Sequence, residues 1–140
     1  MKDIQNFELA QYGIRTNHSV MDNGERRFRL AGSDGSCYIR TEAADDSGWQ
    51  NSHWHTRLSE ICIVQEGWVV YAELIDGKVV ANKYTAGETY LIRPLIHHNT
   101  YLASHSILHT VKFGDCSDPD WIASPELDAL VKGTDPESLL

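Results

Sequence analysis

Positive charge is scarce in this 140-residue sequence, in which 12 lysines and arginines are opposed by 20 acidic residues and the formal net charge is −8 at pH 7. Affinity for a phosphate backbone comes mainly from Lys and Arg, so this deficit argues against a nucleic-acid partner. The same excess of acids disfavours binding to an anionic membrane surface. Neither nucleic acid nor membrane is therefore an expected partner.

Long hydrophobic runs are also absent. No apolar stretch approaches the ~20 residues that a membrane-spanning helix needs. The first ten residues, MKDIQNFELA, lack the apolar core of a signal peptide. These two absences together predict a cytoplasmic location.

Cysteines are few. Cys37, Cys62 and Cys116 are odd in number, far apart and without a Cys-x-x-Cys pair. A disulfide framework or a cysteine zinc site requires paired or closely spaced thiols. We therefore expect three reduced thiols that are packed in the core or exposed.

The residues that are present describe one globular domain with frequent turn signals. Hydrophobic residues make up 41% and charged residues 23% of the chain, as in an ordinary folded domain. Asn23-Gly24, Asp34-Gly35 and Asp76-Gly77 predict two-residue hairpins, because the central residues of such turns need positive φ. Runs rich in β-branched and aromatic residues flank these turns. The predicted strands are 26–31, 36–42, 59–65, 68–75, 78–84, 88–94 and 105–113.

Strands that recur about every ten residues, without long helical periodicity between them, indicate an all-β barrel or sandwich. Only the ends look helical. Ser124 as N-cap, Pro125 at the first helical position and Gly133 as a stop predict a short helix over 125–132, an appendage to the β core. Residues 6–12 are a second candidate for a turn of helix.

The segment HWHTRLSE, residues 53–60, carries the clearest chemical signal. Side chains alternate along a strand, so His53 and His55 point to one face and Trp54 to the other. Glu60 follows a short connection and can reach the same space from the next strand. Imidazole nitrogens and a carboxylate are ligands that divalent Fe, Mn, Ni, Co and Zn accept. A lone His-x-His pair is a weak signal, and further features are needed.

Two spaced motifs supply those features. Gly48 precedes His53 by four residues, four residues separate His55 from Glu60, and six separate Glu60 from Gly67. This pattern resembles the first conserved motif of the cupin superfamily. Residues 87–98, GETYLIRPLIHH, resemble the second motif, with a Gly, a strand, a Pro and a His eleven positions after the Gly.

The second motif departs from the family pattern at two places. Leu95 or Ile96 stands where the family usually has a Gly after the proline, and Leu102 occupies the place of a trailing Asn. We therefore expect that the turn after Pro94 differs in shape.

The resemblance implies a single-domain cupin, an all-β double-stranded β-helix or jelly-roll barrel, with short helical segments at the termini. It covers residues 25–115. Residues 1–24 are then an N-terminal extension with a short helix or strand, and residues 116–140 a C-terminal tail with a short helix.

The resemblance also implies one divalent metal ion held by His53, His55, Glu60 and His98. His98 matches the family's histidine by its offset from Gly87, whereas His97 falls on the opposite strand face. Only one of the two neighbours can face the site if the segment is extended.

Other residues suggest how a substrate is held. Arg57, two residues after His55, and Arg93, before Pro94, suit an anionic group through bidentate hydrogen bonds, although a solvated arginine is the ordinary alternative. Tyr90 lies on a predicted strand and either lines the cavity or packs in the core. His109, if it faces inward, is a candidate general acid or base, and otherwise a packed histidine.

These features favour a metal-dependent cupin enzyme whose small-molecule substrate is oxygenated and anionic, such as a keto acid or sugar derivative. Isomerase or epimerase chemistry ranks slightly ahead of oxygenation. The alternatives are a metal-dependent dioxygenase and a non-catalytic cupin that binds a small ligand. We further expect a homodimer, in which Ile61 and Ile63 on the outer strand face meet the partner.

Overall fold

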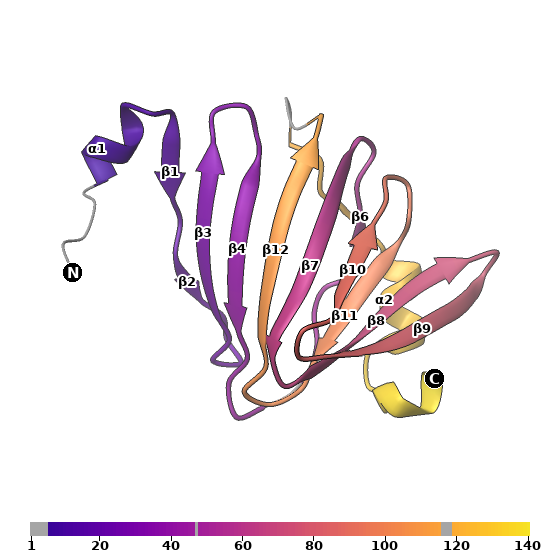
Figure 1. Cartoon of the computed structure of the whole chain (residues 1–140). Helices are drawn as coiled ribbons and strands as arrows, with labels where there is room; N and C mark the ends of the chain where they lie inside the picture. Colours follow the sequence, from indigo (N-terminus) through magenta and orange to yellow (C-terminus); the bar gives the residue numbers. More distant parts are fainter. Residues whose placement is uncertain (1–5, 47, 116–118) are drawn as a thin grey trace.

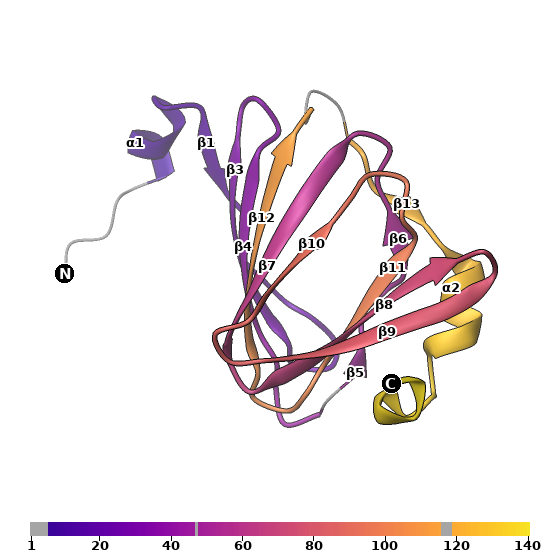
Figure 2. The ribbon, with the colours of Figure 1, turned by 45° about the vertical axis from the view of Figure 1, so that its right-hand side comes forward.

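The computed structural model of the chain describes residues 6–46, 48–115 and 119–140, and its strands form two antiparallel sheets that face each other (Figures 1 and 2). The first sheet has the order β1-β3-β4-β12-β7-β10, with β2 also paired to β3, and the second has the order β13-β6-β11-β8-β9, with β5 paired to β11. This arrangement is a jelly-roll sandwich, which confirms the predicted all-β class.

Seven strands make the first sheet: β1 (Ile14–Thr16), β2 (Ser19–Val20), β3 (Arg26–Gly32), β4 (Cys37–Glu42), β7 (Leu58–Glu66), β10 (Thr89–Ile92) and β12 (Ile107–Gly114). Six make the second: β5 (Gly48–Trp49), β6 (His53–Trp54), β8 (Trp68–Ile75), β9 (Lys78–Thr85), β11 (His98–Leu102) and β13 (Ile122–Ala123). The described helical segments are α1 (Asn6–Ala10), α2 (Pro125–Val131) and the 3-10 turn η1 (Pro136–Leu139). All seven predicted strands are present. The polar sequence HNTYL of β11 gave no strand signal.

One of the three predicted two-residue hairpins is confirmed. Ile75 pairs with Lys78, and Asp76 and Gly77 between them have φ values of 50° and 75°. The other two turns also join antiparallel strands, but the predicted two-residue loop is wrong for both, because the connections are longer: residues 21–25 join β2 to β3, and residues 33–36 join β3 to β4. Their Asn and Asp side chains instead accept hydrogen bonds from the backbone two residues on, which stabilises a wider turn.

Gly67 marks the passage from β7 in the first sheet to β8 in the second. Its φ is 72°, and a Cβ there would lie 2.6 Å from Oγ of Ser106. Both the backbone conformation and the close approach therefore require glycine at this crossing.

The main core lies between the two sheets. Its buried members are Cys62, Val64, Val69, Tyr71, Tyr90, Ile92, Leu102 and Leu108. Side chains of both sheets contribute, so burial of this apolar surface holds the sheets face to face. Cys62 is a buried free thiol, as expected, Cys37 is half-buried, and Cys116 lies outside the described residues.

The C-terminal segment is an integral part of the structure, which corrects its description as an appendage. α2 forms at the predicted place, and Leu127 and Val131 are fully buried in a second cluster with Ala72 of β8 (Figure 2). Burying two such side chains contributes about 1.5–3 kcal/mol each. Ser124 precedes the helix but makes no capping bond, because its hydroxyl is bonded to His97. No helix in the described part of the chain is long and apolar enough to cross a membrane.

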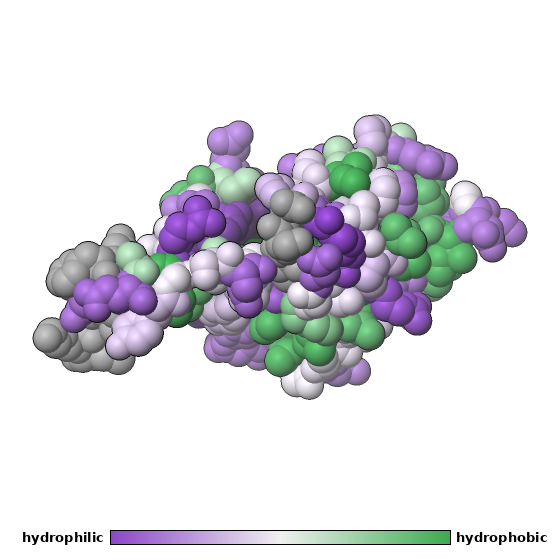
Figure 3. All heavy atoms as spheres, turned by 90° about the horizontal axis from the view of Figure 1, so that it is seen from above, coloured by the Kyte–Doolittle hydropathy of each residue, from purple (hydrophilic) through white to green (hydrophobic). Residues whose placement is uncertain are grey.

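The end of the sandwich that carries the β3–β4 turn is seen from above in Figure 3. Hydrophilic side chains predominate in the middle and on the left of this view, and hydrophobic ones gather on the right and along the lower edge.

Candidate metal centre

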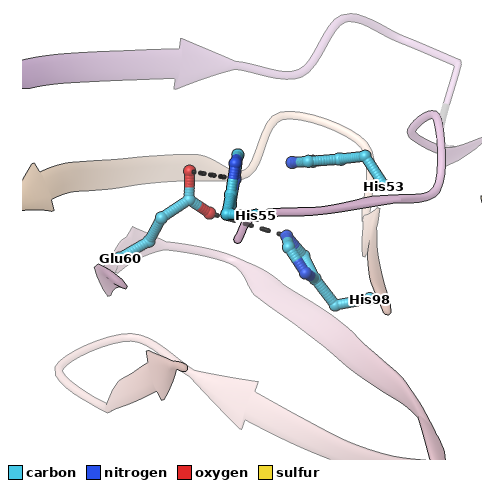
Figure 4. Close-up of side chains that lie close together, drawn as sticks. All are labelled: His53, His55, Glu60 and His98. Atoms are coloured by element: carbon cyan, nitrogen blue, oxygen red, sulfur yellow. Dashed lines mark ion pairs between the residues drawn. The ribbon is translucent and has the colours of Figure 1, made fainter. Parts of the chain in front are cut away.

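Four side chains from both sheets converge on one point (Figure 4). His53 lies on β6, His55 follows it by two residues, Glu60 lies on β7, and His98 begins β11. His98 pairs directly with His53 across the ladder, so these two rings meet with their centroids 4.3 Å apart. One ligand atom from each of the four residues lies within 4.8 Å of the others.

The second ring nitrogen, Nδ1, of each histidine faces a backbone carbonyl oxygen. The acceptors are Asn51 for His53, Asp120 for His55 and Ile96 for His98. A carbonyl can only accept, so Nδ1 carries the proton and Nε2 presents a lone pair. This backbone anchoring of the outer nitrogen is the usual arrangement of metal-binding histidines in proteins.

The inward nitrogens fit a metal ion. Nε2 of His55 and Nε2 of His98 are buried and have no hydrogen-bond partner among the described residues. They lie 3.3 and 3.6 Å from the two carboxylate oxygens of Glu60 (Figure 4). Buried polar atoms without partners are rare in folded proteins. The four side chains could therefore hold a metal ion, which would satisfy these atoms together.

The protonation states suit this donor set. Burial, assisted by the charge of His98, lowers the pKa of His53 to about 3. Burial alone would raise the pKa of Glu60, but its polar surroundings, with the Lys112 ammonium 2.8 Å from Oε1, hold it well below its usual range. His53 is thus neutral and Glu60 ionised at neutral pH, which are the forms that bind divalent ions.

Lys112 is a member of the site that the sequence did not reveal. Its Nζ lies 2.8 Å from Oε1 of Glu60, and its side chain is 18% exposed. It reaches the cluster from β12, where a lysine between Val111 and Phe113 reads as an ordinary outward-facing residue. No spacing rule in the sequence links it to Glu60.

Asp120 is a second residue that the sequence did not reveal. Its backbone oxygen accepts the His55 ring proton, and its buried carboxylate accepts from the backbone N–H groups of Thr56, Arg57 and Leu58. The Thr56 hydroxyl adds a further bond of 2.6 Å. Burial would raise the pKa of Asp120, but these hydrogen bonds lower it. One residue therefore fixes both the His55 ring and the connection that leads to Glu60.

His98 and His97 are separated as predicted. His98 is buried in the cluster, whereas His97 stacks on Trp54 with an interplanar angle of 9° and bonds to Ser124 at 2.7 Å. The alternation of side chains along β11 accounts for this division.

Two predicted substrate residues lie away from the cluster. Arg57 is on a bend instead of a continuing strand, and its Nε lies 3.6 Å from Asp115. Arg93 is exposed after β10. Because the strand does not continue through Arg57, its side chain does not share the face of His55 as a continuous strand would require.

The two other candidates also lie apart from the ligand atoms. Tyr90 is buried between the Tyr71 and Tyr84 rings and bonds to Thr100, so the packing alternative describes it best. His109 points out of the sandwich, so the inward orientation on which a catalytic role depended is not present, and the packed alternative describes it best. Leu108 and Lys112 face inward from the same strand, and the His109 ring bonds outside to a tyrosine and a glutamine.

A cavity of about 250 Å³ adjoins the cluster. His53 and Glu60 line it together with Arg27, Arg29, Lys112 and Trp121. The indole of Trp121 stacks on the His53 ring with centroids 5.3 Å apart and is 53% exposed. The space beside the ligand atoms is therefore bordered by three cationic side chains, in a chain whose net charge is −8.

Comparison with solved structures identifies proteins of similar fold. A structure of oxalate oxidase gives a TM-score of 0.59 at 19% identity, covering 85% of this chain and 70% of that protein. A structure of oxalate decarboxylase from Bacillus subtilis gives a TM-score of 0.63 at 13% identity. The match covers 89% of this chain but only 36% of that protein. A CENP-C domain from Drosophila melanogaster gives 0.56 at 14% identity, covering 70% of this chain and 72% of the domain.

The likeness at these identities concerns the fold alone. No protein-family model and no curated protein sequence matches the chain. The matched structures include oxalate enzymes and a CENP-C domain seen bound to CAL1, so one fold serves catalysis and protein binding. What this chain does must therefore be argued from its site.

Proposed function

We propose that this chain, a cupin by its fold, holds one divalent metal ion at His53, His55, Glu60 and His98 and acts on a small anionic metabolite in the adjoining cavity. One observation carries the proposal: three imidazoles are tied by Nδ1 to backbone carbonyls, and their Nε2 atoms converge with one carboxylate. A structural histidine cluster would pair its inner nitrogens with protein donors or acceptors, whereas two of these are buried and have no hydrogen-bond partner in the described part of the chain.

The cavity supports an anionic substrate. Arg27, Arg29 and Lys112 border it, and a guanidinium pairs well with carboxylate or phosphate. A bound divalent ion would supply Lewis-acid polarisation of a carbonyl or hydroxyl oxygen. Buried Glu60 and its lysine partner, with Trp121 over His53, would orient the substrate and limit water beside that oxygen.

Isomerase or epimerase chemistry on a keto acid or sugar derivative is the first reaction class to test, and metal-dependent dioxygenation is the second. A non-catalytic, ligand-binding cupin is the alternative from another class. The CENP-C neighbour, which was solved in complex with CAL1, gives this alternative its support. The polar, cationic cavity beside the ligand atoms favours a small molecule over a protein segment as the occupant.

Metal analysis followed by two reaction assays tests the function. The assays use protein purified without chelators and protein reconstituted separately with Fe, Mn, Ni, Co and Zn. Over a panel of keto acids and sugar acids, NMR in D₂O measures the replacement of substrate C–H hydrogen by deuterium, and an oxygen electrode measures dioxygen uptake. Exchange without dioxygen uptake supports isomerase chemistry, and uptake with the iron form supports oxygenation. Metal binding with neither activity would leave the ligand-binding alternative and reject the enzyme.

A further inference from the structure

We propose that Arg29, with Arg27, forms an anion subsite that receives the second acidic group of a small diacid whose first oxygen group lies at the metal ligands. The proposal rests on the proposed function and specifies its substrate class. The second acidic group is a carboxylate or a phosphate, since a guanidinium recognises both by the same paired N–H geometry.

The strand pattern directs both arginines inward. Along β3, Arg27 and Arg29 alternate with Arg26 and Phe28, so the two pairs lie on opposite faces of the sheet. Arg26 is ion-paired with Glu42 and lies over the Phe28 ring on the outer face. Arg27 and Arg29 line the cavity that also contains His53 and Glu60.

The two arginines differ in their partners. Arg27 is ion-paired through Nε with the buried carboxylate of Glu25 at 2.5 Å, which fixes its position. Arg29 donates from Nη1 to the Ser19 hydroxyl at 2.8 Å, and no carboxylate of the described residues pairs with it. A guanidinium has five N–H donors, so most of those on Arg29 remain for a ligand.

The surroundings of Arg29 favour a bound anion. Burial, with the charge of Arg27 beside it, lowers the pKa of Arg29, which means that the folded chain disfavours this cation. An acidic group placed between the two guanidiniums would reverse that penalty. At the other end of the cavity Lys112 is already engaged by Glu60, so it does not compete for the second acidic group.

The size of the cavity limits the ligand. A volume of about 250 Å³ corresponds to about eight water molecules at ~30 Å³ each. A diacid of a few carbons fits this space, and it can touch the arginines and the metal ligands together because one cavity is lined by both.

Calorimetric titration at constant ionic strength tests the subsite. Malonate, succinate and 3-phosphoglycerate are titrated into the metal-reconstituted protein, with acetate as the single-acid probe. We expect the best diacid to bind about tenfold or more tightly than acetate, and Arg29→Gln to remove this advantage, as the loss of a charge-assisted hydrogen bond predicts. Whether a dicarboxylate or the phosphorylated acid binds best identifies the second group.

Controls separate this proposal from the proposed function. Arg26→Gln removes the same charge three residues away on the outer face, and it should leave diacid affinity unchanged. Arg29→Lys, which keeps the charge, guards against misfolding and should retain part of the affinity. Inorganic phosphate titrated into chelator-treated protein tests the arginines alone, so a chain that binds no metal can still show Arg29-dependent anion binding.

Three results would contradict the proposed subsite. The first is equal affinity for acetate and the diacids in the parent protein. The second is diacid affinity that is unchanged in Arg29→Gln, and the third is diacid affinity that is lowered equally in Arg26→Gln. Metal content that is equal in all these variants shows that any loss of affinity arises at the arginines.

Discussion

At the scale of single residues, the clustering of the four proposed metal ligands could be predicted because spacing carried the signal. His53, His55, Glu60 and His98 stand at motif offsets, and the structure gathers all four. Lys112 and Asp120 could not be predicted, because their roles arise from contacts between segments far apart in sequence. An isolated Asp or Lys has no local pattern that reveals such a contact.

His109 shows that a correctly predicted strand does not by itself fix which face each of its side chains occupies. Along β12 the more apolar residues, Val111 and Phe113, lie on the exposed face, while Thr110 and Lys112 face the cavity. The usual pattern of apolar inside and polar outside is inverted here, since a polar site occupies the interior. The predicted strand alone therefore left the face of His109 undecided.

Asp120 gives a prediction about stability. Replacing it with Ala leaves three backbone N–H groups without their carboxylate acceptor, and we expect the free energy of unfolding to fall by about 1–3 kcal/mol. Asp120→Asn keeps the size of the side chain but loses its charge, so its free energy of unfolding should fall by less. Urea unfolding at pH 7 measures both changes.

Measuring the free energy of unfolding of the parent and of Asp120→Asn at several pH values tests the contribution of the Asp120 charge. Because the pKa of Asp120 is lowered in the folded chain, the unfolded chain binds more protons as the pH falls below the ordinary Asp value of about 3.9. The stabilisation is thus complete above that value and is lost on further acidification. The difference between parent and Asp120→Asn should be constant from pH 5 to 8 and shrink below about pH 4. A difference that grows on acidification would contradict this account.

At the scale of elements, the turn after Pro94 contains a leucine in an unusual backbone conformation. Leu95, one of the two residues that stand where the cupin pattern usually has a glycine, has φ of 65°, the region that glycine adopts without strain. Its N–H donates to the carbonyl of His55 at 2.7 Å, and its side chain is 64% exposed. The hydrogen bond to the metal-site segment holds the backbone in this conformation.

Leu95 therefore predicts opposite effects for two substitutions. Leu95→Gly removes strain of about 1–2 kcal/mol per left-handed residue at an entropic cost of about 0.5–1 kcal/mol, so stability should rise slightly or stay equal. Leu95→Val places a β-branched side chain at positive φ and should lower the free energy of unfolding by about 1 kcal/mol or more. Thermal melts of the two variants check the order, and a Gly variant less stable than the Val variant would refute it.

The C-terminal elements explain how the His-x-His strand is fixed. β13 pairs with β6, and the Asp128 carboxylate on α2 accepts the Ser52 N–H at 2.8 Å. The sequence predicted the helix from its proline and its stop signal, because those cues are local. Its docking beside Ser52 was not predictable, since that contact spans 76 residues.

At the scale of the whole molecule, the outer face of the first sheet carries a continuous apolar row. The register places five residues side by side across five strands: Leu30, Tyr38, Val111, Ile61 and Leu91. Three of them are between 40 and 48% exposed. A contiguous apolar face of this kind is typical of a protein contact surface.

We therefore expect a homodimer in which this row meets its copy. Sedimentation at micromolar concentration should give twice the monomer mass, and Val111→Lys or Leu91→Lys should give monomers. Ile75→Lys changes a similarly exposed residue at the tip of the β8–β9 hairpin and should remain dimeric. A monomeric parent protein would reject the dimer.

The central claim is that the converging Nε2 atoms and Glu60 bind a metal ion, and two neighbouring histidines test it most directly. Metal content is measured after reconstitution and gel filtration for the parent protein, His98→Ala, Glu60→Gln and His97→Ala. The account predicts one equivalent of a divalent ion in the parent and in His97→Ala, and loss of the ion in the other two. A parent that binds none of Fe, Mn, Ni, Co and Zn, or equal loss in His97→Ala and His98→Ala, would contradict it.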